Sequence, residues 1–337
     1  MALPETQQAV QLLRYPVGAP RPDDFGMARR PLPQPGAGQV LLRTHILSID
    51  PYLRPLLAGR YVVPRPALGS IVPGMGLARV VHSDHPSFAV GEWVVGETGW
   101  CEYTVADMRT LRRVDPALAP PSTALGVLGI PGLAAWAGLN SIGLPTKGDT
   151  VLVSTATGAV GSVAGQLARL AGCRTVGIVG LEDKRQIALD EFGFDACVSY
   201  RSPAFVDDLH AACPDGIDVY FDNVGGAVLE AAIPLLRQRA RVVLCGLSSQ
   251  YNQDQRPPGP NLGPVIGARA RLEGLVVYDH LHRFAEFHAE VAPLVRDGAV
   301  RYREEVSEGL ASAAQAFVDL MQGKNRGKAL VRVEDDS

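Results

Sequence analysis

The 337-residue chain is predicted to be an α/β protein with a doubly wound parallel sheet and a second, mainly β domain. Its length suits two domains better than one small core. The first 120 residues or so carry short β-type runs separated by Gly and Pro. After Pro120-Pro121, strand-like and helix-like segments alternate, which is typical of a parallel sheet covered by helices.

The β-type runs of the first part are bounded by turn residues, as at 35–38 and 90–92. We expect strands at 39–44, 76–81, 93–95 and 101–105. Many short strands with such punctuation indicate an irregular barrel or an open β domain.

The second part alternates regularly. Strands are expected at 151–153, 174–179, 196–198, 219–221, 241–245 and 272–277. Helices are expected at 159–170, 183–192, 204–212, 227–236 and 284–297. The tail, with strands at 300–303 and 328–333 and a helix at 310–321, resembles the first part in texture, which predicts that the chain returns to the first domain.

Composition excludes several classes of protein. The net charge is −3 and Lys and Arg form no cluster, so we expect no nucleic-acid partner. No apolar run approaches the roughly 20 residues that span a bilayer, and the start lacks the pattern of a secretory signal, so we expect a cytoplasmic protein away from membranes.

Metal binding is not expected. The five cysteines, at 101, 173, 197, 213 and 245, form no Cys-x-x-Cys pair and are predicted to be reduced, mostly buried thiols. His280-x-His282 and His288 have neither a Glu-x-x-His register nor a nearby cysteine. No Gly-x-Ser-x-Gly elbow supports a hydrolase.

A glycine-rich turn follows the strand at 151–153 and precedes a helix, which is the context that a dinucleotide fingerprint requires. Its residues are Ala156, Thr157, Gly158, Ala159, Val160 and Gly161. Gly158 permits a close approach of the backbone to a pyrophosphate, and Gly161 permits close packing of helix on strand. The N–H groups and partial positive charge of the helix start then favour the phosphates.

The end of the next strand distinguishes the cofactors. NAD-binding folds place Asp or Glu there for the ribose 2′-hydroxyl, whereas this strand ends at Gly180. Gly180 leaves space for a 2′-phosphate, and Lys184 supplies a positive charge. Glu182 and Asp183 weaken the argument, so the residues favour NADP while NAD stays open.

Two later strands end in loops that we expect at the ligand-binding edge of the sheet. One contains Asn223 and Gly225; the other runs from Cys245 through Gly246, Leu247 and Ser248 to Tyr251. In the first domain, Tyr52 follows an apolar run; its hydroxyl can donate to a carbonyl, but spacing alone favours a packed aromatic.

Taken together, five segments resemble the zinc-free medium-chain dehydrogenase/reductases of the leukotriene 12-hydroxydehydrogenase, prostaglandin reductase and bacterial curcumin reductase type. The segments, which span nearly the whole chain, are Leu47 to Arg54, Gly129 to Ala135, Thr157 to Val163, Phe221 to Gly226 and Gly323 to Lys328.

The resemblance implies a GroES-like substrate domain at 1–122, completed by 298–337, and a Rossmann NADP-binding domain at 123–297. It implies NADPH, with Lys184 and Tyr200 at the 2′-phosphate. It also implies a homodimer. The other implied cofactor contacts are Asn223, the loop from Cys245 to Tyr251, Leu275, Val276, Val277 and Asn325.

The implied reaction is reduction of the C=C bond of an α,β-unsaturated ketone or aldehyde, with hydride transfer to the β-carbon and an enolate stabilised by a neutral donor. One position departs from the family: Gly267 stands where plant and animal members have a Tyr. Tyr52 and Tyr251 are therefore the candidate donors. Quinone reduction and a non-catalytic NADP(H)-binding regulatory role remain alternatives.

Overall fold

The computed structural model describes residues 3–61, 63–255 and 257–333. The chain divides into two units, Met1–Leu125 with Glu304–Ser337, and Gly126–Arg303. Arg301 exchanges two hydrogen bonds with Gln166, at 2.7 and 2.8 Å, which ties the stretch before Glu304 to the second unit. The domain limits inferred from the sequence placed the return at 298, and they stay a prediction.

The second unit is built on a parallel sheet, six-stranded over the described residues, in the order β10-β9-β8-β11-β12-β13. The strands are β8 (Thr150–Ser154), β9 (Arg174–Val179), β10 (Ala196–Ser199), β11 (Ile217–Asp222), β12 (Leu236–Leu244) and β13 (Arg271–Gly274). This is the strand order of the Rossmann fold, with the reversal between β8 and β11. The predicted α/β fold class is confirmed.

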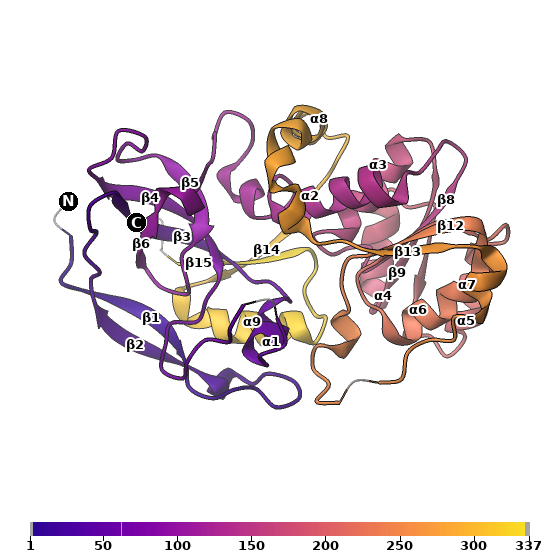
Figure 1. Ribbon diagram of the computed structural model, residues 1–337, viewed down its shortest axis with the longest axis horizontal. Coiled ribbons are helices and arrows are strands. Elements are labelled where there is room, and N and C mark those ends of the chain that lie inside the picture. Colours follow the sequence, from indigo (N-terminus) through magenta and orange to yellow (C-terminus); the bar gives the residue numbers. More distant parts are fainter. Residues whose placement is uncertain (1–2, 62, 256, 334–337) are drawn as a thin grey trace. The chain divides into compact units, whose positions relative to one another are not determined.

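Helices cover both faces of this sheet (Figure 1). They are α2 (Ile130–Ala137), α3 (Gly161–Leu170), α4 (Glu182–Gln186), α5 (Phe205–Ala212), α6 (Gly226–Ala232), α7 (Gly263–Ala268) and α8 (Phe284–Arg296). In Figure 1, α2 and α3 lie above the sheet, and α5, α6 and α7 lie below it. Because both faces are covered, the central strands are continuous apolar runs, and Val151, Leu152 and Val153 are fully buried.

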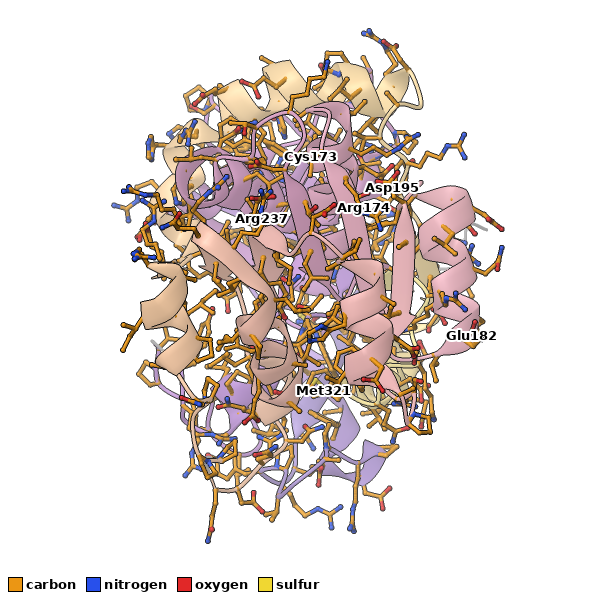
Figure 2. All side chains as sticks on the ribbon, turned by 90° about the vertical axis from the view of Figure 1, so that its right-hand side faces the viewer. Cys173, Arg174, Glu182, Asp195, Arg237 and Met321 are labelled. Atoms are coloured by element: carbon orange, nitrogen blue, oxygen red, sulfur yellow. The ribbon has the colours of Figure 1, made fainter. Side chains whose placement is uncertain are left out.

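Carboxylates fix the amino ends of the strands. Asp218 accepts a hydrogen bond from the Thr150 N–H at 2.9 Å, and Asp195 accepts one from the Thr175 N–H at 2.7 Å. Arg237 pairs with Asp218 at 3.1 Å. Figure 2 labels Asp195 and Arg237 at one end of the sheet and Glu182, which follows the other end of β9, away from them. These contacts lie at the amino ends of the strands, whereas loops follow the carboxyl ends at the opposite edge of the sheet.

The first unit contains a mixed sheet in the order β14-β15-β3-β4-β5-β7, with β6 also paired to β3, and a separate β1-β2 hairpin. The strands are β1 (Thr6–Leu12), β2 (Phe25–Pro31), β3 (Gln39–Ser48), β4 (Met75–Ser83), β5 (Trp93–Glu97), β6 (Tyr103–Asp107), β7 (Arg112–Arg113), β14 (Glu304–Glu308) and β15 (Lys328–Arg332). Helix α1 (Leu53–Leu57) follows β3, and α9 (Ala313–Met321) precedes β15. The second, mainly β part of the prediction is confirmed.

Residues from both ends of the chain build the core of this unit. Phe25, Trp100 and Phe317 pack ring against ring, with centroids 5.6 to 6.0 Å apart. Phe317 lies on α9, and β15 pairs antiparallel with β3. The predicted return of the chain to the first sheet is therefore observed, and α9 closes the core.

Several element limits inferred from the sequence are wrong. The predicted strand 300–303 lies at Glu304–Glu308, because Arg301 is bonded to Gln166 instead of to a strand. The predicted helix 227–236 ends earlier, and Leu236 already begins β12. The predicted strand 272–277 ends at Gly274. Over the described residues, no helix is long and apolar enough to cross a bilayer.

Close helix packing depends on Gly165. A Cβ added to this residue of α3 would lie 2.0 Å from the ring of Phe194, which is only 4% exposed. We expect Gly165→Ala to lower the free energy of unfolding by about 1–3 kcal/mol, because the buried ring has no room to move. The control is Gly267→Ala in α7, where a Cβ meets nothing within 4 Å. Urea denaturation measures both, and equal effects of the two variants would contradict the packing argument.

Candidate cofactor-binding site

The glycine turn between β8 and α3 is shaped by one backbone contact. Thr155 adopts a left-handed conformation with φ of 55°, which turns its carbonyl under the start of α3. A Cβ on Gly161 would lie 2.2 Å from this carbonyl oxygen, and a Cβ on Gly158 would lie 2.7 Å from the Thr155 side chain. Only glycine therefore fits at 161, and a side chain at 158 would require the Thr155 side chain to move.

The first N–H groups of a helix have no partner within the helix, and α3 begins at this turn. Thr157 is 3% exposed, while Ala159 and Val160 are half-buried. The backbone of the turn, and not its side chains, is thus what a ligand would meet. Such a cradle at a helix start suits a pyrophosphate group.

The carboxyl end of β9 differs from the corresponding strand end of NAD-binding folds. A Cβ on Gly180 would lie 2.9 Å from the ring of Tyr200, which is 41% exposed. Lys184 is 7% exposed, in the first turns of α4. Glu182, whose charge weakened the sequence argument, pairs with Arg185 at 3.0 Å. An aromatic ring thus lies at the position where an NAD-binding fold places a carboxylate, and Lys184 follows in the next helix.

Two loops at the ends of β11 and β12 are joined by backbone hydrogen bonds. The N–H of Cys245 donates to the Asp222 carbonyl at 2.8 Å, and that of Ser249 donates to Val224 at 3.1 Å. Asn223 lies between these contacts, and its side-chain Nδ2 donates to the Ser154 carbonyl at 2.8 Å. The loops 222–226 and 245–251 therefore form one layer over the edge of the sheet.

The remaining predicted contacts of this unit join the same edge. The Leu275 N–H donates to the Leu244 carbonyl at 2.9 Å, which places Leu275, Val276 and Val277 beside the start of the 245–251 loop. Tyr251 lies over this loop, where its hydroxyl is 3.4 Å from the Leu247 nitrogen. Gly267 lies exposed on α7, with open space where a side chain would begin.

The two predicted residues of the first unit lie near an ion pair in the sequence. Lys328, with a side chain 5% exposed, contacts Asp50 at 2.7 Å and the Ile49 carbonyl at 2.9 Å. Tyr52 follows this turn and packs on the ring of Tyr61, with centroids 5.6 Å apart. Asn325 precedes Lys328, and its Nδ2 donates to the Gly327 carbonyl at 2.7 Å. The ion pair brings the segments of Tyr52 and Asn325 together.

The cysteines are free thiols, four of them buried. Burial raises the pKa of Cys101 and of Cys197 to about 12, so both stay protonated at neutral pH. Within the described ranges, no group of three or more His, Cys, Asp or Glu residues could hold a metal ion.

Sequence reasoning missed the residues beneath the loops. Ser154, Tyr220 and Asp222 are all fully buried at the ends of β8 and β11. A polar residue that closes an otherwise apolar strand was the available signal, since such a residue must find partners in the fold.

Comparison with known proteins identifies the family. Residues 8–114 match the model of the N-terminal domain of oxidoreductase, and residues 159–294 match that of zinc-binding dehydrogenase. The NADPH-dependent curcumin reductase of Escherichia coli is 42% identical over 96% of both chains. The chain belongs to the medium-chain dehydrogenase/reductase family. The family predicted from the sequence motifs is confirmed.

Two further relatives extend the comparison. The NADP⁺-dependent 2-alkenal reductase of Nicotiana tabacum is 38% identical over 99% of both chains. The crystal structure of CurA from Vibrio vulnificus in complex with NADPH superposes with a TM-score of 0.92 at 40% identity, covering 97% of this chain and 99% of that one.

Lys184→Ala tests the assignment of the 2′-phosphate position. Loss of a hydrogen bond to a charged group costs about 1.5–3 kcal/mol, so we expect the Kd for NADPH to rise roughly 10- to 100-fold. The Kd for NADH, which has no 2′-phosphate, should change little. Lys147→Ala, at an exposed lysine of the same unit, is the control. Fluorescence titration gives each Kd; equal losses for the two cofactors would refute the assignment.

Proposed function

We propose that the chain is an NADPH-dependent reductase of carbon–carbon double bonds conjugated to a ketone or aldehyde. The observation that carries the proposal is the end of β9, where Gly180, Tyr200 and the buried Lys184 replace the carboxylate of NAD-binding folds. The relatives support the same reaction class, since their names are those of a curcumin reductase and a 2-alkenal reductase. The cofactor is NADPH, as the sequence predicted.

The residues present fit this cofactor. A side chain at Gly158 or Gly161 would meet Thr155 and disturb the turn at the start of α3, and both positions are glycine. The turn 156–161 would hold the pyrophosphate, and Lys184 and Tyr200 the 2′-phosphate. The loops 222–226 and 245–251, with 275–277, would line the nicotinamide half. Asn325 of the first unit is a further proposed contact.

NADPH, when bound, supplies the hydride that the β-carbon of the substrate accepts. The protein's task is then to orient the two reactants and to stabilise the negative charge that develops on the carbonyl oxygen. A proton from solvent or from a tyrosine then reaches the α-carbon, which gives the saturated carbonyl product. A neutral hydroxyl stabilises the charge on the carbonyl oxygen without a strongly shifted acid or base. Gly267 cannot donate, so the donor has to come from another residue.

Tyr52 is the better of the two candidate donors. The Tyr251 hydroxyl is turned toward the Leu247 nitrogen of its own loop, which suits a role in holding that loop. Tyr52 stands at the start of α1, on a turn fixed by the Lys328–Asp50 pair, and packs on Tyr61 through its ring. A rigid support of this kind suits a hydroxyl that must meet a substrate oxygen.

Turnover on a substrate panel tests the function. We expect NADPH oxidation with conjugated enals and enones, and a product that keeps its carbonyl group. The matched control is the saturated aldehyde of the same length, which should not react. Tyr52→Phe should lower kcat on the order of 100-fold, as for loss of one oxyanion donor, and Tyr251→Phe should lower it less.

Three outcomes would contradict the proposal. An alcohol product would mean carbonyl reduction. Turnover of quinones alone would make the chain a quinone reductase. NADPH binding without turnover of any substrate would indicate a regulatory NADP(H)-binding protein.

The cytoplasmic location inferred from the sequence stays a prediction.

A homodimer belongs to the same proposal. β13 ends the sheet order, and its residues are largely exposed. Exposed apolar side chains lie near it in the chain, namely Leu262, Ile266 and Val276. An unpaired strand edge is a template for another strand, so we propose that β13 pairs with its copy in a second chain.

Hydrogen exchange tests this pairing. Amides of 271–274 should be protected at high protein concentration and lose protection on dilution, because the pairing is bimolecular. The control is β10, the strand at the other edge of the same sheet, whose exchange should not depend on concentration. A monomer by light scattering at every concentration would disprove the dimer.

A further inference from the structure

Asp222 is a fully buried carboxylate with no cationic partner among the ion pairs of the described residues. Four groups donate to it instead. They are the Tyr220 hydroxyl at 2.8 Å, the Ser154 hydroxyl at 3.1 Å, the Val224 N–H at 2.9 Å and the Gly225 N–H at 3.0 and 3.1 Å. Two of these donors are backbone groups of the loop that follows Asp222.

The loop can reach the carboxylate because of its two glycines. Gly225 and Gly226 have φ of 66° and 55°, and a Cβ on Gly225 would lie 2.5 Å from the Leu247 side chain. The chain therefore curls back over the end of β11, which aims the N–H groups of Val224 and Gly225 at Asp222. When the loop after Asp222 folds, its N–H groups therefore provide the hydrogen bonds that the buried carboxylate needs.

Ser154 links this carboxylate to Asn223. Its hydroxyl donates to Asp222 and accepts from the Asn223 N–H at 2.8 Å, while its carbonyl accepts from the Asn223 side chain at 2.8 Å. Tyr220 completes the arrangement. Burial and the nearby Asp222 charge hold the pKa of Tyr220 well above its usual range, so its hydroxyl remains a donor at neutral pH.

The same strand offers a contrasting carboxylate. Asp218, 9% exposed near the amino end of β11, accepts a backbone N–H of β8, from Thr150. It pairs with the half-exposed Arg237 and supports no loop at the carboxyl edge. Asp218 thus holds strand to strand, whereas Asp222 holds strand to loop.

We propose that Asp222 is a positioning residue for NADPH, which acts through Ser154 on Asn223 and through the N–H groups of Val224 and Gly225 on the joined loops 222–226 and 245–251. The inference rests on the proposed function, because the loops matter only if NADPH binds there. Asp222 itself need not touch the cofactor, since its carboxylate oxygens are directed at the four donors beneath and within the loop.

Asp222→Asn tests the inference with little change of volume. With its amide oxygen at the Oδ1 position, the Asn would keep the four contacts without the negative charge, and its nitrogen would face the Gly225 N–H that now reaches Oδ2 at 3.1 Å, so the support of the loop should weaken. We expect the Kd for NADPH to rise about 10-fold, because four hydrogen bonds lose their charge assistance and the fifth contact, from Gly225 to Oδ2, becomes an N–H opposed to an N–H. Amides of 222–226 and 245–251 in the cofactor-free protein should exchange faster, while those of β8 and β9 keep their protection.

Asp218→Asn is the matched control. It should lower the Tm, as loss of a buried paired carboxylate does, and leave the Kd for NADPH within about twofold of the wild type. Ser154→Ala keeps the experiment decisive should Asp222→Asn not fold; it removes only the hydroxyl between Asp222 and Asn223 and should raise the Kd several-fold.

The possible results distinguish failure of the inference about Asp222 from failure of the proposed function. An unchanged Kd and unchanged loop exchange in Asp222→Asn or Ser154→Ala would overturn the inference while the wild type still binds NADPH. An equal rise of Kd in Asp218→Asn would also overturn it, since the effect would then be general destabilisation. Failure of the wild type to bind NADPH would instead remove the proposed function, and the inference with it.

Discussion

The close approach of α3 to the end of β8 is the constraint on which the candidate site depends. The Thr155 carbonyl occupies the space where any side chain at 161 would begin. Gly165 admits the Phe194 ring against the same helix, and a Cβ on Gly177 of β9 would lie 2.8 Å from Ala156. These glycines bring helix, turn and neighbouring strand together at the start of α3.

An aspartate lies near each end of β11, and the two carboxylates are stabilised in different ways. At the amino end, the charge of Asp218 can be shared with Arg237, because solvent is near and no ligand has to enter. At the carboxyl end, an arginine side chain would occupy the space that the loops define. Asp222 is satisfied by neutral donors instead, two of which the loop itself provides. The buried charge therefore specifies one loop conformation.

The fold of the second unit could be predicted because its central strands are short apolar runs followed by turns. Val151 to Val153 and Val219 to Phe221 are buried on both faces, as the sequence indicates. The hairpin β1-β2 was not predicted, because its strands mix polar and apolar residues and adopt strand structure through their pairing with each other. Helix α2 lacks a polar face, since six of its eight residues are buried, and so shows no helical periodicity.

The sequence predicts those parts of the candidate site in which a residue's role depends on its neighbours in the sequence, as in the glycine turn. It does not predict the parts in which the role depends on strands that meet only in the sheet. Ser154 and Asp222 lie 68 residues apart and come into contact because β8 pairs with β11. Tyr200 reaches Gly180 because its N–H bonds to the Val179 carbonyl, a consequence of the pairing of β9 with β10.

This second contact bears on the proposed preference for NADPH over NADH. A carboxylate at position 180 would have to displace the Tyr200 ring before it could meet a ribose hydroxyl. The acidic neighbour Glu182 is engaged by Arg185, so its charge opposes Lys184 less than the sequence suggests. Lys184 is buried, where water screens its charge weakly and an anion is stabilised more strongly than at the surface. The preference for a 2′-phosphate that we propose would thus depend on the pairing of two strands as much as on the one lysine that the sequence displays.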